Sequence, residues 1–419
     1  MKQVREVWIV AAARSPIGRF RGALSSLTAV EIASQVLASL VSSCEIDPSS
    51  VGECIIGNAI GAGLGQNPAK QVVLGAGLPD SVSAFCINKV CSSGMKAIGL
   101  GVDSIAMGRE DVVIAGGMES MSNAPHVLTG IRGVAKLGDI TLVDLMARIE
   151  GDALEGVDLT LADEMLRAGL VDAYSCSHMG AIAESVAIEF EVPREEQDAF
   201  AAASHRKAAD AIADGSFASE IVPITLGDGS VVTRDEGVRA GTTIGGLSGL
   251  QTVFSSEGSI TAGNASQLSD GAAAVVLMSP KHAMTLGLEP LASVVGYSSI
   301  GNEPDQYGIA PVAAVTKLLR NNDLRVADMD LVEINEAFCV STLAVLRQLG
   351  IDPRRVNVNG GATALGHPIG ASGARVLVTL LHAMKARGAK RGLATLCHGG
   401  GGADAVAVEA LAPSSAAHR

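Results

Sequence analysis

Cys91 is the first residue whose type and position suggest chemistry. It stands in Asn88-Lys89-Val90-Cys91-Ser92-Ser93-Gly94-Met95-Lys96, where a predicted strand at 85–89 is followed by a predicted helix at 95–107. A helix N-terminus carries unpaired N–H groups and partial positive charge, which lower the pKa of a nearby thiol and make it a better nucleophile. The alternative is a buried structural cysteine, a common use of the free residue.

His367 is the second such residue, in Gly366-His367-Pro368. Pro368 disfavours helical geometry at His367 and holds it on the turn before a predicted helix at 371–385. The neighbouring glycines permit a close approach of substrate. The imidazole is therefore suited to act as the general base for a thiol, although a solvent-exposed loop histidine would look the same.

Cys397 and Asn335 both stand at the ends of predicted strands, at 393–397 and 330–334. Cys397 precedes His398 and the glycines 399–402, whose N–H groups can hold an oxyanion; the alternative is a tight turn beside a core cysteine. Asn335 can hold a water molecule, or it can cap the next helix. Two cysteines, one histidine and one asparagine at loop ends suit thioester chemistry, in which one thiol carries an acyl group and another moves a proton near an α-carbon.

The elements that must position these residues follow an α/β pattern. Further strands are predicted at 4–13, 53–59, 111–115 (closed by Gly116 and Gly117), 272–278, 356–359 and 405–410, and further helices at 29–43, 193–214, 312–320 and 339–349. Strand, glycine-containing turn and helix recur at 85–107 and 356–385, which indicates an internal duplication. The segment 119–258 is richer in charge and glycine, and it is interpreted as an inserted, ligand-facing lobe.

Composition narrows the class of protein. Of 419 residues, 48% are apolar and 18% charged, which favours a large buried core over disorder. The net charge of −13, without a basic block, argues against nucleic acid as a partner. Seven cysteines without a C-x-x-C pair predict neither a disulfide framework nor a metal site, and fit a reducing cytosol. No apolar run approaches the ~20 residues of a membrane span, and the first residues are interpreted as a strand rather than a signal peptide.

Six sequence blocks resemble the thiolase family, in the family's order, between about residues 4 and 410. They are the block around Cys91, Ala115-Gly116-Gly117-Met118-Glu119-Ser120-Met121-Ser122-Asn123-Ala124-Pro125, Gly263-Asn264-Ala265-Ser266, Asn335-Glu336-Ala337-Phe338, Gly366-His367-Pro368-Ile369-Gly370-Ala371-Ser372-Gly373, and Cys397 with its glycine run. The resemblance implies a thiolase fold of two duplicated α-β-α-β-α layered halves, each with a five-stranded sheet, and an inserted loop domain. We place the N-terminal half at 1–118 (completed by about 259–285), the coenzyme A-binding loop domain at 119–258, the C-terminal half at 286–411 and a tail at 412–419.

The resemblance also implies the acetyl-CoA C-acetyltransferase reaction, without a metal or a covalently bound cofactor. This reaction is the reversible Claisen condensation of two acetyl-CoA to acetoacetyl-CoA and coenzyme A, or thiolysis of a short 3-ketoacyl-CoA. By resemblance, Cys91 attacks the thioester and becomes acylated, His367 accepts its proton, and Cys397 removes an α-proton. His367 and a water on Asn335 would hold the enolate oxygen, and the N–H groups of Cys91 and Gly399 would form a second oxyanion hole.

Contacts with the acyl-CoA substrate are implied for residues that match the family's pattern: His178, Met179, Arg239, Ala262, Ser266 and, beside the acyl group, Tyr307. The bulky Tyr307 suggests a short acyl group. The sequence departs from the family at Gly246, where a serine is common, and at 250–254, which lacks the usual Arg-Pro or Lys-Pro. The stretch between residues 138 and 163 is longer than usual. His398 either tunes the pKa of Cys397 or is a neutral replacement, and we favour the second.

Three alternatives stay open beside this prediction. The chain could be a degradative 3-ketoacyl-CoA thiolase of broader chain length, or one acting on 2-methylacetoacetyl-CoA. It could be a related ketoacyl synthase, although Cys397 argues against that, because a proton-abstracting cysteine is needed only when no carboxylate leaves. It could also be a non-catalytic acyl-CoA-binding protein. We expect a cytoplasmic homodimer or homotetramer that acts in fatty acid and lipid metabolism.

Overall fold

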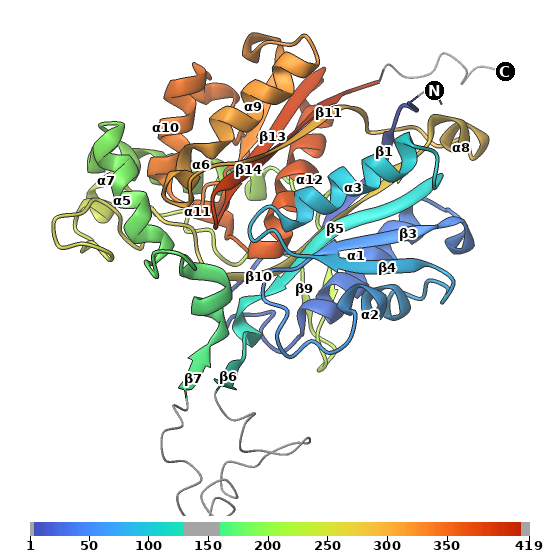
Figure 1. Cartoon of the computed structure of the whole chain (residues 1–419), viewed down its shortest axis with the longest axis horizontal. Coiled ribbons are helices and arrows are strands. Elements are labelled where there is room, and N and C mark those ends of the chain that lie inside the picture. The colour runs from blue at the N-terminus through green and yellow to red at the C-terminus, as the bar shows by residue number, and fades with distance from the viewer. Residues whose placement is uncertain (1–3, 130–159, 412–419) are drawn as a thin grey trace, which may run out of the picture.

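A ten-stranded sheet runs through the molecule in the computed structural model, which describes residues 4–129 and 160–411 (Figure 1). Its strands are β1 (Trp8–Arg14), β2 (Gly18–Arg19), β3 (Glu53–Gly57), β4 (Ser83–Ile87), β5 (Val112–Ser120), β10 (Ser269–Met278), β11 (Ala292–Gly301), β12 (Leu331–Ile334), β13 (Arg391–His398) and β14 (Gly402–Glu409). The helices that cover it are α1 (Ala29–Ser43), α2 (Pro68–Gly75), α3 (Ser93–Ala106), α8 (Pro280–Thr285), α9 (Ala310–Asn321), α10 (Cys339–Leu349) and α12 (Ile369–Arg387).

The sheet consists of two halves with the same plan. The N-terminal half has the order β4-β3-β5-β10-β1, and the C-terminal half has the order β12-β13-β14-β11. The halves join where β1 pairs antiparallel with β11, at Trp8–Ser293 and Ile9–Ala292. In each half a parallel pair (β3 with β5, β12 with β13) is followed by two antiparallel neighbours. This topology agrees with the predicted duplication.

The prediction of a strand at 356–359 is wrong, because the structure has no strand there. The described C-terminal half therefore lacks a counterpart of β4, the fifth strand of the N-terminal half. Only Val356 forms a parallel bridge, with Val332. Asn357 adopts a positive φ of 44°, and its side-chain amide pairs with both the N–H and the C=O of Ile334, at 2.8 Å each. A side chain has thus replaced the main-chain ladder there, since an asparagine tolerates the left-handed region and offers both donor and acceptor.

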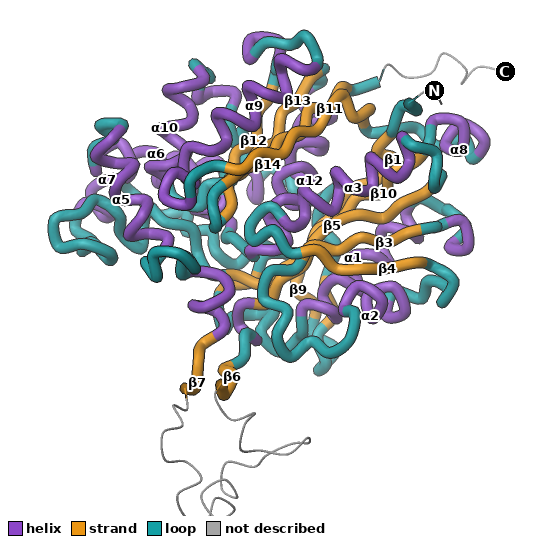
Figure 2. Tube along the Cα trace, in the orientation of Figure 1, coloured by secondary structure: helices purple, strands orange, loops and turns teal. Residues whose placement is uncertain are grey.

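Helices α3 and α12 form a central layer between the two sheet halves, with α1 and α2 outside one half and α9 and α10 outside the other (Figure 2). Alternate residues of β10 show why this strand is apolar throughout. Ala272, Ala274, Val276 and Met278 pack in the cluster under α1, whereas Ala273, Val275 and Leu277 pack in the cluster under α3 and α12. Both faces of the strand are covered, as expected when helices lie on both sides of a sheet.

Several predicted boundaries shift for identifiable reasons. Strand β1 begins at Trp8 rather than at residue 4, and α3 begins at Ser93 rather than at residue 95. Strand β5 does not stop at its glycines but continues to Ser120. A Cβ at Gly117 would lie 2.1 Å from the carbonyl oxygen of Gly370, so the glycine is needed for the close approach of α12.

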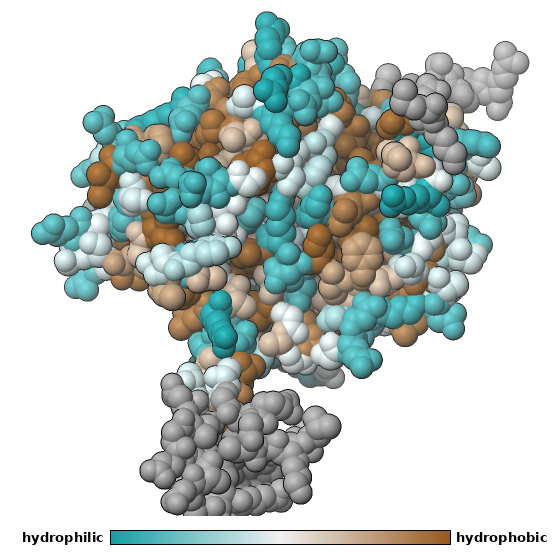
Figure 3. Space-filling model, viewed as in Figure 1, coloured by the Kyte–Doolittle hydropathy of each residue, from teal (hydrophilic) through white to brown (hydrophobic). Residues whose placement is uncertain are grey.

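The predicted lobe contains short elements and two longer helices: β6 (His126–Thr129), β7 (Thr160–Asp163), a π-helix at Met165–Leu170, α5 (Met179–Glu189), α6 (Arg194–Ala213), β8 (Ile224–Thr225), β9 (Val231–Val232) and α7 (Ile244–Ser248). A single turn, α11 (Ala362–Leu365), precedes α12. Most of the stretch expected to be unusually long, and the tail 412–419, lie outside the described residues. Among described helices, none has the length and apolar character needed to cross a membrane. The face drawn in Figure 3 mixes hydrophilic and hydrophobic side chains.

Candidate active site

Cys91 occupies a sharp turn between β4 and α3, two residues before the helix begins at Ser93. The turn depends on Val90, which has a positive φ of 50°. This conformation costs a β-branched residue on the order of 1–3 kcal/mol. Two side chains hold the turn: Asn88 accepts from the Val90 N–H at 2.9 Å, and Ser93 donates to the Val90 carbonyl at 2.7 Å.

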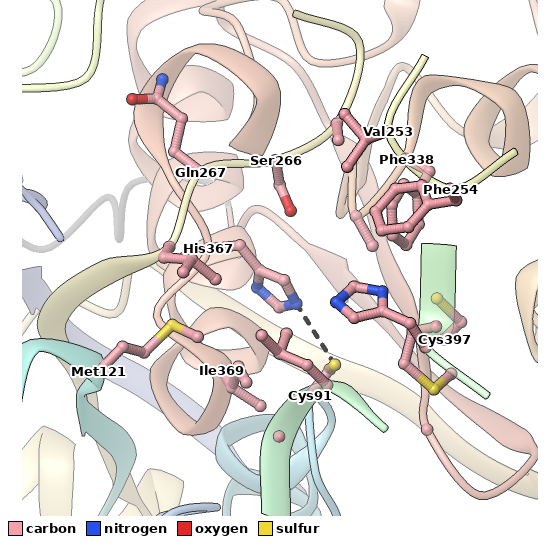
Figure 4. A pocket seen from close by; sticks show the side chains of 18 of the residues that line it. Cys91, Met121, Val253, Phe254, Ser266, Gln267, Phe338, His367, Ile369 and Cys397 are labelled. Atoms are coloured by element: carbon pink, nitrogen blue, oxygen red, sulfur yellow. Dashed lines mark hydrogen bonds between the residues drawn. The ribbon is translucent and has the colours of Figure 1, made fainter. Parts of the chain in front are cut away.

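His367 occupies the matching place in the other half, two residues before α12 begins at Ile369. Because α3 and α12 pack against one another, the two turns meet. The contact is close at two glycines: a Cβ on Gly94 would lie 2.9 Å from the Ala374 nitrogen, and one on Gly373 would lie 2.4 Å from the Met95 nitrogen. The Sγ atom of Cys91 consequently lies 3.3 Å from Nε2 of His367 (Figure 4).

Ser372 determines which nitrogen of His367 is free, a role that the sequence analysis missed although Ser372 lies in a quoted block. Its hydroxyl donates to the Pro368 carbonyl at 2.8 Å and contacts Nδ1 of His367. Since the hydroxyl proton is committed to Pro368, the contact requires Nδ1 to carry the imidazole proton. Nε2 then presents its lone pair to the Cys91 thiol. The available signal was the position of Ser372 on the first turn of the predicted helix, directly after the turn that carries His367.

The expectation of a depressed pKa for Cys91 is wrong. Burial raises the pKa of the Cys91 thiol to about 12, although the backbone N–H groups of Gly399 and of Cys91 itself oppose the shift. Burial, together with the charge of Arg375, lowers the pKa of His367 to about 3. Desolvation disfavours both charged forms. The resting pair is therefore a neutral thiol beside a neutral imidazole.

Both sulfur atoms and the imidazole line one cavity of about 380 Å³. Its walls include most of the residues predicted for the site: Cys91, His178, Met179, Ala262, Ser266, Tyr307, His367, Cys397 and Gly399. In Figure 4, Ser266, Val253 and Phe254 lie on the side opposite Cys91. Arg239 does not join them. Its side chain is exposed, and its backbone N–H donates to Nδ1 of His205 at 3.1 Å.

Cys397 lines this cavity and is almost completely buried. Burial raises the pKa of its thiol, and Cys91 adds to the rise. Tyr307 lines the same cavity as both thiols. Burial is the main cause that raises the pKa of its phenol, followed by Cys397 and Cys91. The hydroxyl of Tyr307 donates to the Met179 carbonyl at 2.8 Å. Because the hydroxyl is engaged with Met179, it is not available to act on a substrate.

Asn335 lies behind His367 rather than in the cavity wall. Its Nδ2 is 3.5 Å from both ring nitrogens of His367, and its Oδ1 is buried without a hydrogen-bond partner among the described residues. The helix-cap alternative is not what the structure has, because α10 begins at Cys339 with Phe338 at its cap position. A buried polar atom left unpaired is costly and indicates a bound water or ligand group.

His178, Val253 and Phe254 form a further part of the cavity wall. His178 caps α5 through Nδ1, which accepts from the Gly180 N–H at 3.0 Å, and its ring stacks on Phe254 with centroids 4.6 Å apart. Burial lowers the pKa of His178. Phe254 and Val253 come from the segment 250–254, which the sequence analysis marked only as a departure. The site as a whole can activate one thiol with a neutral base, hold an oxyanion on two N–H groups and bring a second thiol to the same small space.

Two family descriptions match the chain. Residues 7–281 match "Thiolase, N-terminal domain", and residues 288–410 match "Thiolase, C-terminal domain". Among curated relatives, an acetyl-CoA acetyltransferase of Chromobacterium violaceum is 47% identical over 408 residues, which cover 96% of this chain and 99% of that protein. One of Allochromatium vinosum is 48% identical over 407 residues, covering 96% and 98%.

Two solved structures have the same fold. The crystal structure of a Bacillus anthracis acetyl-CoA acetyltransferase has a TM-score of 0.90 and 41% identity, covering 98% of this chain and 100% of that chain. Human mitochondrial 3-ketoacyl-CoA thiolase has a TM-score of 0.89 and 36% identity, covering 97% and 99%.

Proposed function

The chain belongs to the thiolase family of acyltransferases, and we propose that it condenses two acetyl-CoA to acetoacetyl-CoA, and reverses this by thiolysis, through an acyl group on Cys91. The observation that carries the proposal is the 3.3 Å approach of the Cys91 thiol to Nε2 of His367, inside a cavity that also holds Cys397. Relatives at 47–48% identity over nearly the whole chain bear the name acetyl-CoA acetyltransferase.

In the first half-reaction, the Cys91 sulfur attacks the acetyl carbonyl carbon while its proton passes to Nε2 of His367. The N–H groups of Cys91 and Gly399, both of which belong to residues of the cavity wall, stabilise the oxyanion. When the thioester bond breaks, the departing coenzyme A sulfur takes the proton of Cys397. Acetyl-Cys91, a protonated His367 and a Cys397 thiolate are then left in one cavity.

In the second half-reaction, the Cys397 thiolate takes an α-proton from the next acetyl-CoA. His367 and a water on Oδ1 of Asn335 stabilise the enolate oxygen, which accounts for that buried unpaired atom. The enolate carbon attacks the acetyl-Cys91 carbonyl, the bond to sulfur breaks, and Cys91 recovers its proton from His367. Protons balance over the cycle, and the three groups return to their neutral resting forms without a metal or a bound cofactor.

We propose that His178, Met179, Ala262 and Ser266 contact the pantetheine arm of the acyl-CoA, because they line the same cavity as Cys91. Arg239 lies outside the cavity wall, and we propose that it contacts the nucleotide end of coenzyme A. The 3-ketoacyl-CoA substrate is short, because the bulky Tyr307 lines the cavity that holds both sulfur atoms. A 2-methyl group on the substrate, or a longer chain, remains the second candidate, and human 3-ketoacyl-CoA thiolase is a structural relative of this chain.

A mass measurement tests this function. Intact protein mixed with acetyl-CoA should gain one acetyl group, which peptide mapping places on Cys91 and which Cys91→Ala prevents. Thiolysis rates with 3-ketoacyl-CoA of increasing length, including the 2-methyl C4 substrate, then rank the candidates. Acetylation at another residue, or none, would overturn the proposal.

We also propose a cytoplasmic homo-oligomer that acts in lipid metabolism, built from the halves and loop domain expected from the sequence. Strand β4 ends the sheet, and Phe85 on it is 38% exposed. Hydrophobic side chains gather where β4 lies in Figure 3. An open sheet edge of this kind can pair with the same edge of a second copy. Sedimentation would distinguish a dimer or tetramer from a monomer.

A further inference from the structure

His398 is a buried titratable residue that the proposed mechanism does not use. It follows Cys397 directly, yet it is absent from the described wall of the cavity. The residue is only 8% exposed, and it stands opposite Gly402 as the last pair of the β13–β14 hairpin. The loop of this hairpin is Gly399, Gly400 and Gly401, of which the last two have positive φ.

The hydrogen bond that His398 makes fixes its tautomer. Nδ1 lies 2.8 Å from the carbonyl oxygen of Gly399, which can only accept, so Nδ1 carries the proton. Nε2 is buried without a partner among the described residues. Gly402 leaves room for the ring, since a Cβ there would lie 2.5 Å from Nε2.

The charged groups nearest to His398 are already engaged with each other. Lys89, from the turn that carries Cys91, donates to Asp404 of β14 at 2.8 Å and to Ser299 at 2.6 Å. Tyr297 donates to the same carboxylate at 2.7 Å. Burial and the charge of Lys89 lower the pKa of His398, while the Gly399 carbonyl and Asp404 oppose the shift. The imidazole therefore acts as a neutral donor with one partner, Gly399.

Gly399 matters because it lines the same cavity as Cys91, and its N–H is one of the groups that oppose the rise in the pKa of the Cys91 thiol. A glycine has no side chain to restrict its backbone, so something else must fix the direction of that N–H. We propose that His398 is a positioning residue, whose hydrogen bond to the Gly399 carbonyl holds the Gly399 N–H toward Cys91 so that it can stabilise the oxyanion formed during acylation. The inference rests on the proposed function. It gives His398 a role in acylation although the residue does not line the cavity.

Asparagine and leucine at this position provide a matched test. Nδ2 of an asparagine stands the same number of bonds from the backbone as Nδ1 of histidine, so His398→Asn can keep the hydrogen bond. His398→Leu has a carbon atom there and cannot. We expect His398→Leu to acetylate Cys91 from acetyl-CoA roughly 10- to 100-fold more slowly in single-turnover mass measurements. This is less than the roughly 10²–10³-fold loss on removal of an oxyanion donor, because the Gly399 N–H is misplaced and not removed. His398→Asn should stay within about threefold of the original rate.

Coenzyme A affinity and melting temperature are measured on the same samples. Coenzyme A affinity should change little, because His398 does not line the cavity. The melting temperature should fall slightly in His398→Leu, because a buried hydrogen bond is lost. His282→Leu on α8 is the matched control, since its Nε2 is also buried without a partner but lies outside the site, and its acetylation rate should be unchanged. If His398→Leu does not fold, His398→Ala takes its place as the variant without the donor.

Equal loss in the leucine and asparagine variants would overturn the inference, because packing and not the hydrogen bond would then matter. Unchanged acetylation in His398→Leu would overturn it as well. Failure of the unmodified protein to acetylate at Cys91 is a different result, which sinks the proposed function itself.

Discussion

The ends of β3 and β12 occupy equivalent places in the two halves, and each strand is followed by an asparagine. Asn58 follows β3 and Asn335 follows β12. The register extends the equivalence: Gly57 pairs with Gly117 and Ile334 with Thr395, so two residues further on Glu119 corresponds to Cys397. The shared strand order of the two halves thus gives an asparagine and a second functional group equivalent positions in each half: Asn58 with Glu119, and Asn335 with Cys397.

The two sites are used differently. In the N-terminal half, Glu119 accepts from the side chain of Asn58 at 2.7 Å and from the N–H groups of Ala59, Ile60 and Gly370 at 2.9–3.2 Å. In the C-terminal half, Oδ1 of Asn335 is unpaired and Cys397 faces the cavity. The comparison teaches that the strand end whose polar groups are satisfied, after β3, is structural. The strand end that leaves a polar atom unpaired, after β12, can act on a ligand.

Replacing Cys397 should give the largest difference between the halves. Cys397→Ser removes the group that exchanges the α-proton but leaves Cys91 and His367 intact. Condensation and thiolysis should fall about 10³-fold, in the range of one general acid–base group. Acetylation of Cys91 should fall less, because Cys397 only supplies a proton to the departing coenzyme A sulfur in that step. Rapid-quench measurement of each half-reaction checks this. Equal loss of both half-reactions would show that the two thiols do not divide the work.

The paired variants Asn335→Ala and Asn58→Ala test the comparison directly. Asn335→Ala should lower kcat about 100-fold through loss of an enolate-stabilising group, with little loss of stability, since it removes a buried unpaired atom. Asn58→Ala should lower the free energy of unfolding by about 1–3 kcal/mol and leave kcat of the folded protein nearly unchanged. Urea denaturation and steady-state rates give both quantities. The comparison fails if both variants lose the same property.

Ser372→Ala should have a smaller effect, about five- to tenfold on kcat, as expected for losing one orienting hydrogen bond of about 1 kcal/mol. Without Ser372, neither tautomer of His367 is favoured, and the lone pair is no longer reserved for Cys91. Ser372→Thr keeps the hydroxyl and serves as control. Full activity in Ser372→Ala would mean that another group fixes the tautomer.

The pH profile should show the least change of all. The pKa of His367 is lowered to about 3, so the base stays neutral as pH falls below its ordinary value of about 6.5. The pKa of Cys91 is raised to about 12, so the thiol stays protonated as pH rises through about 8.5. The value of kcat/KM should therefore vary little between about pH 5 and pH 9. An acid limb near the ordinary histidine pKa that His367→Asn abolishes would contradict this account.

Much of the fold followed from pattern. The helices predicted at 29–43 and 339–349 have those bounds in α1 and α10, because apolar periodicity and local capping define their ends. Strand β11 and helices α2 and α5 were not predicted. Strand β11 carries serine and glycine among its apolar residues, so it has no clear alternation, and its position between β1 and β14 is set by pairing with distant strands.

For the site, the sequence alone determined which side chains stand at the turns: Cys91 and His367 before helices, and Asn335 and Cys397 after strands. Only the tertiary structure decided that the two turns meet, because that depends on glycine contacts between α3 and α12. It also reversed the expected pKa shift of Cys91, since desolvation outweighs the N–H groups around the thiol. Burial and convergence are properties of the packed chain, and no local pattern encodes them.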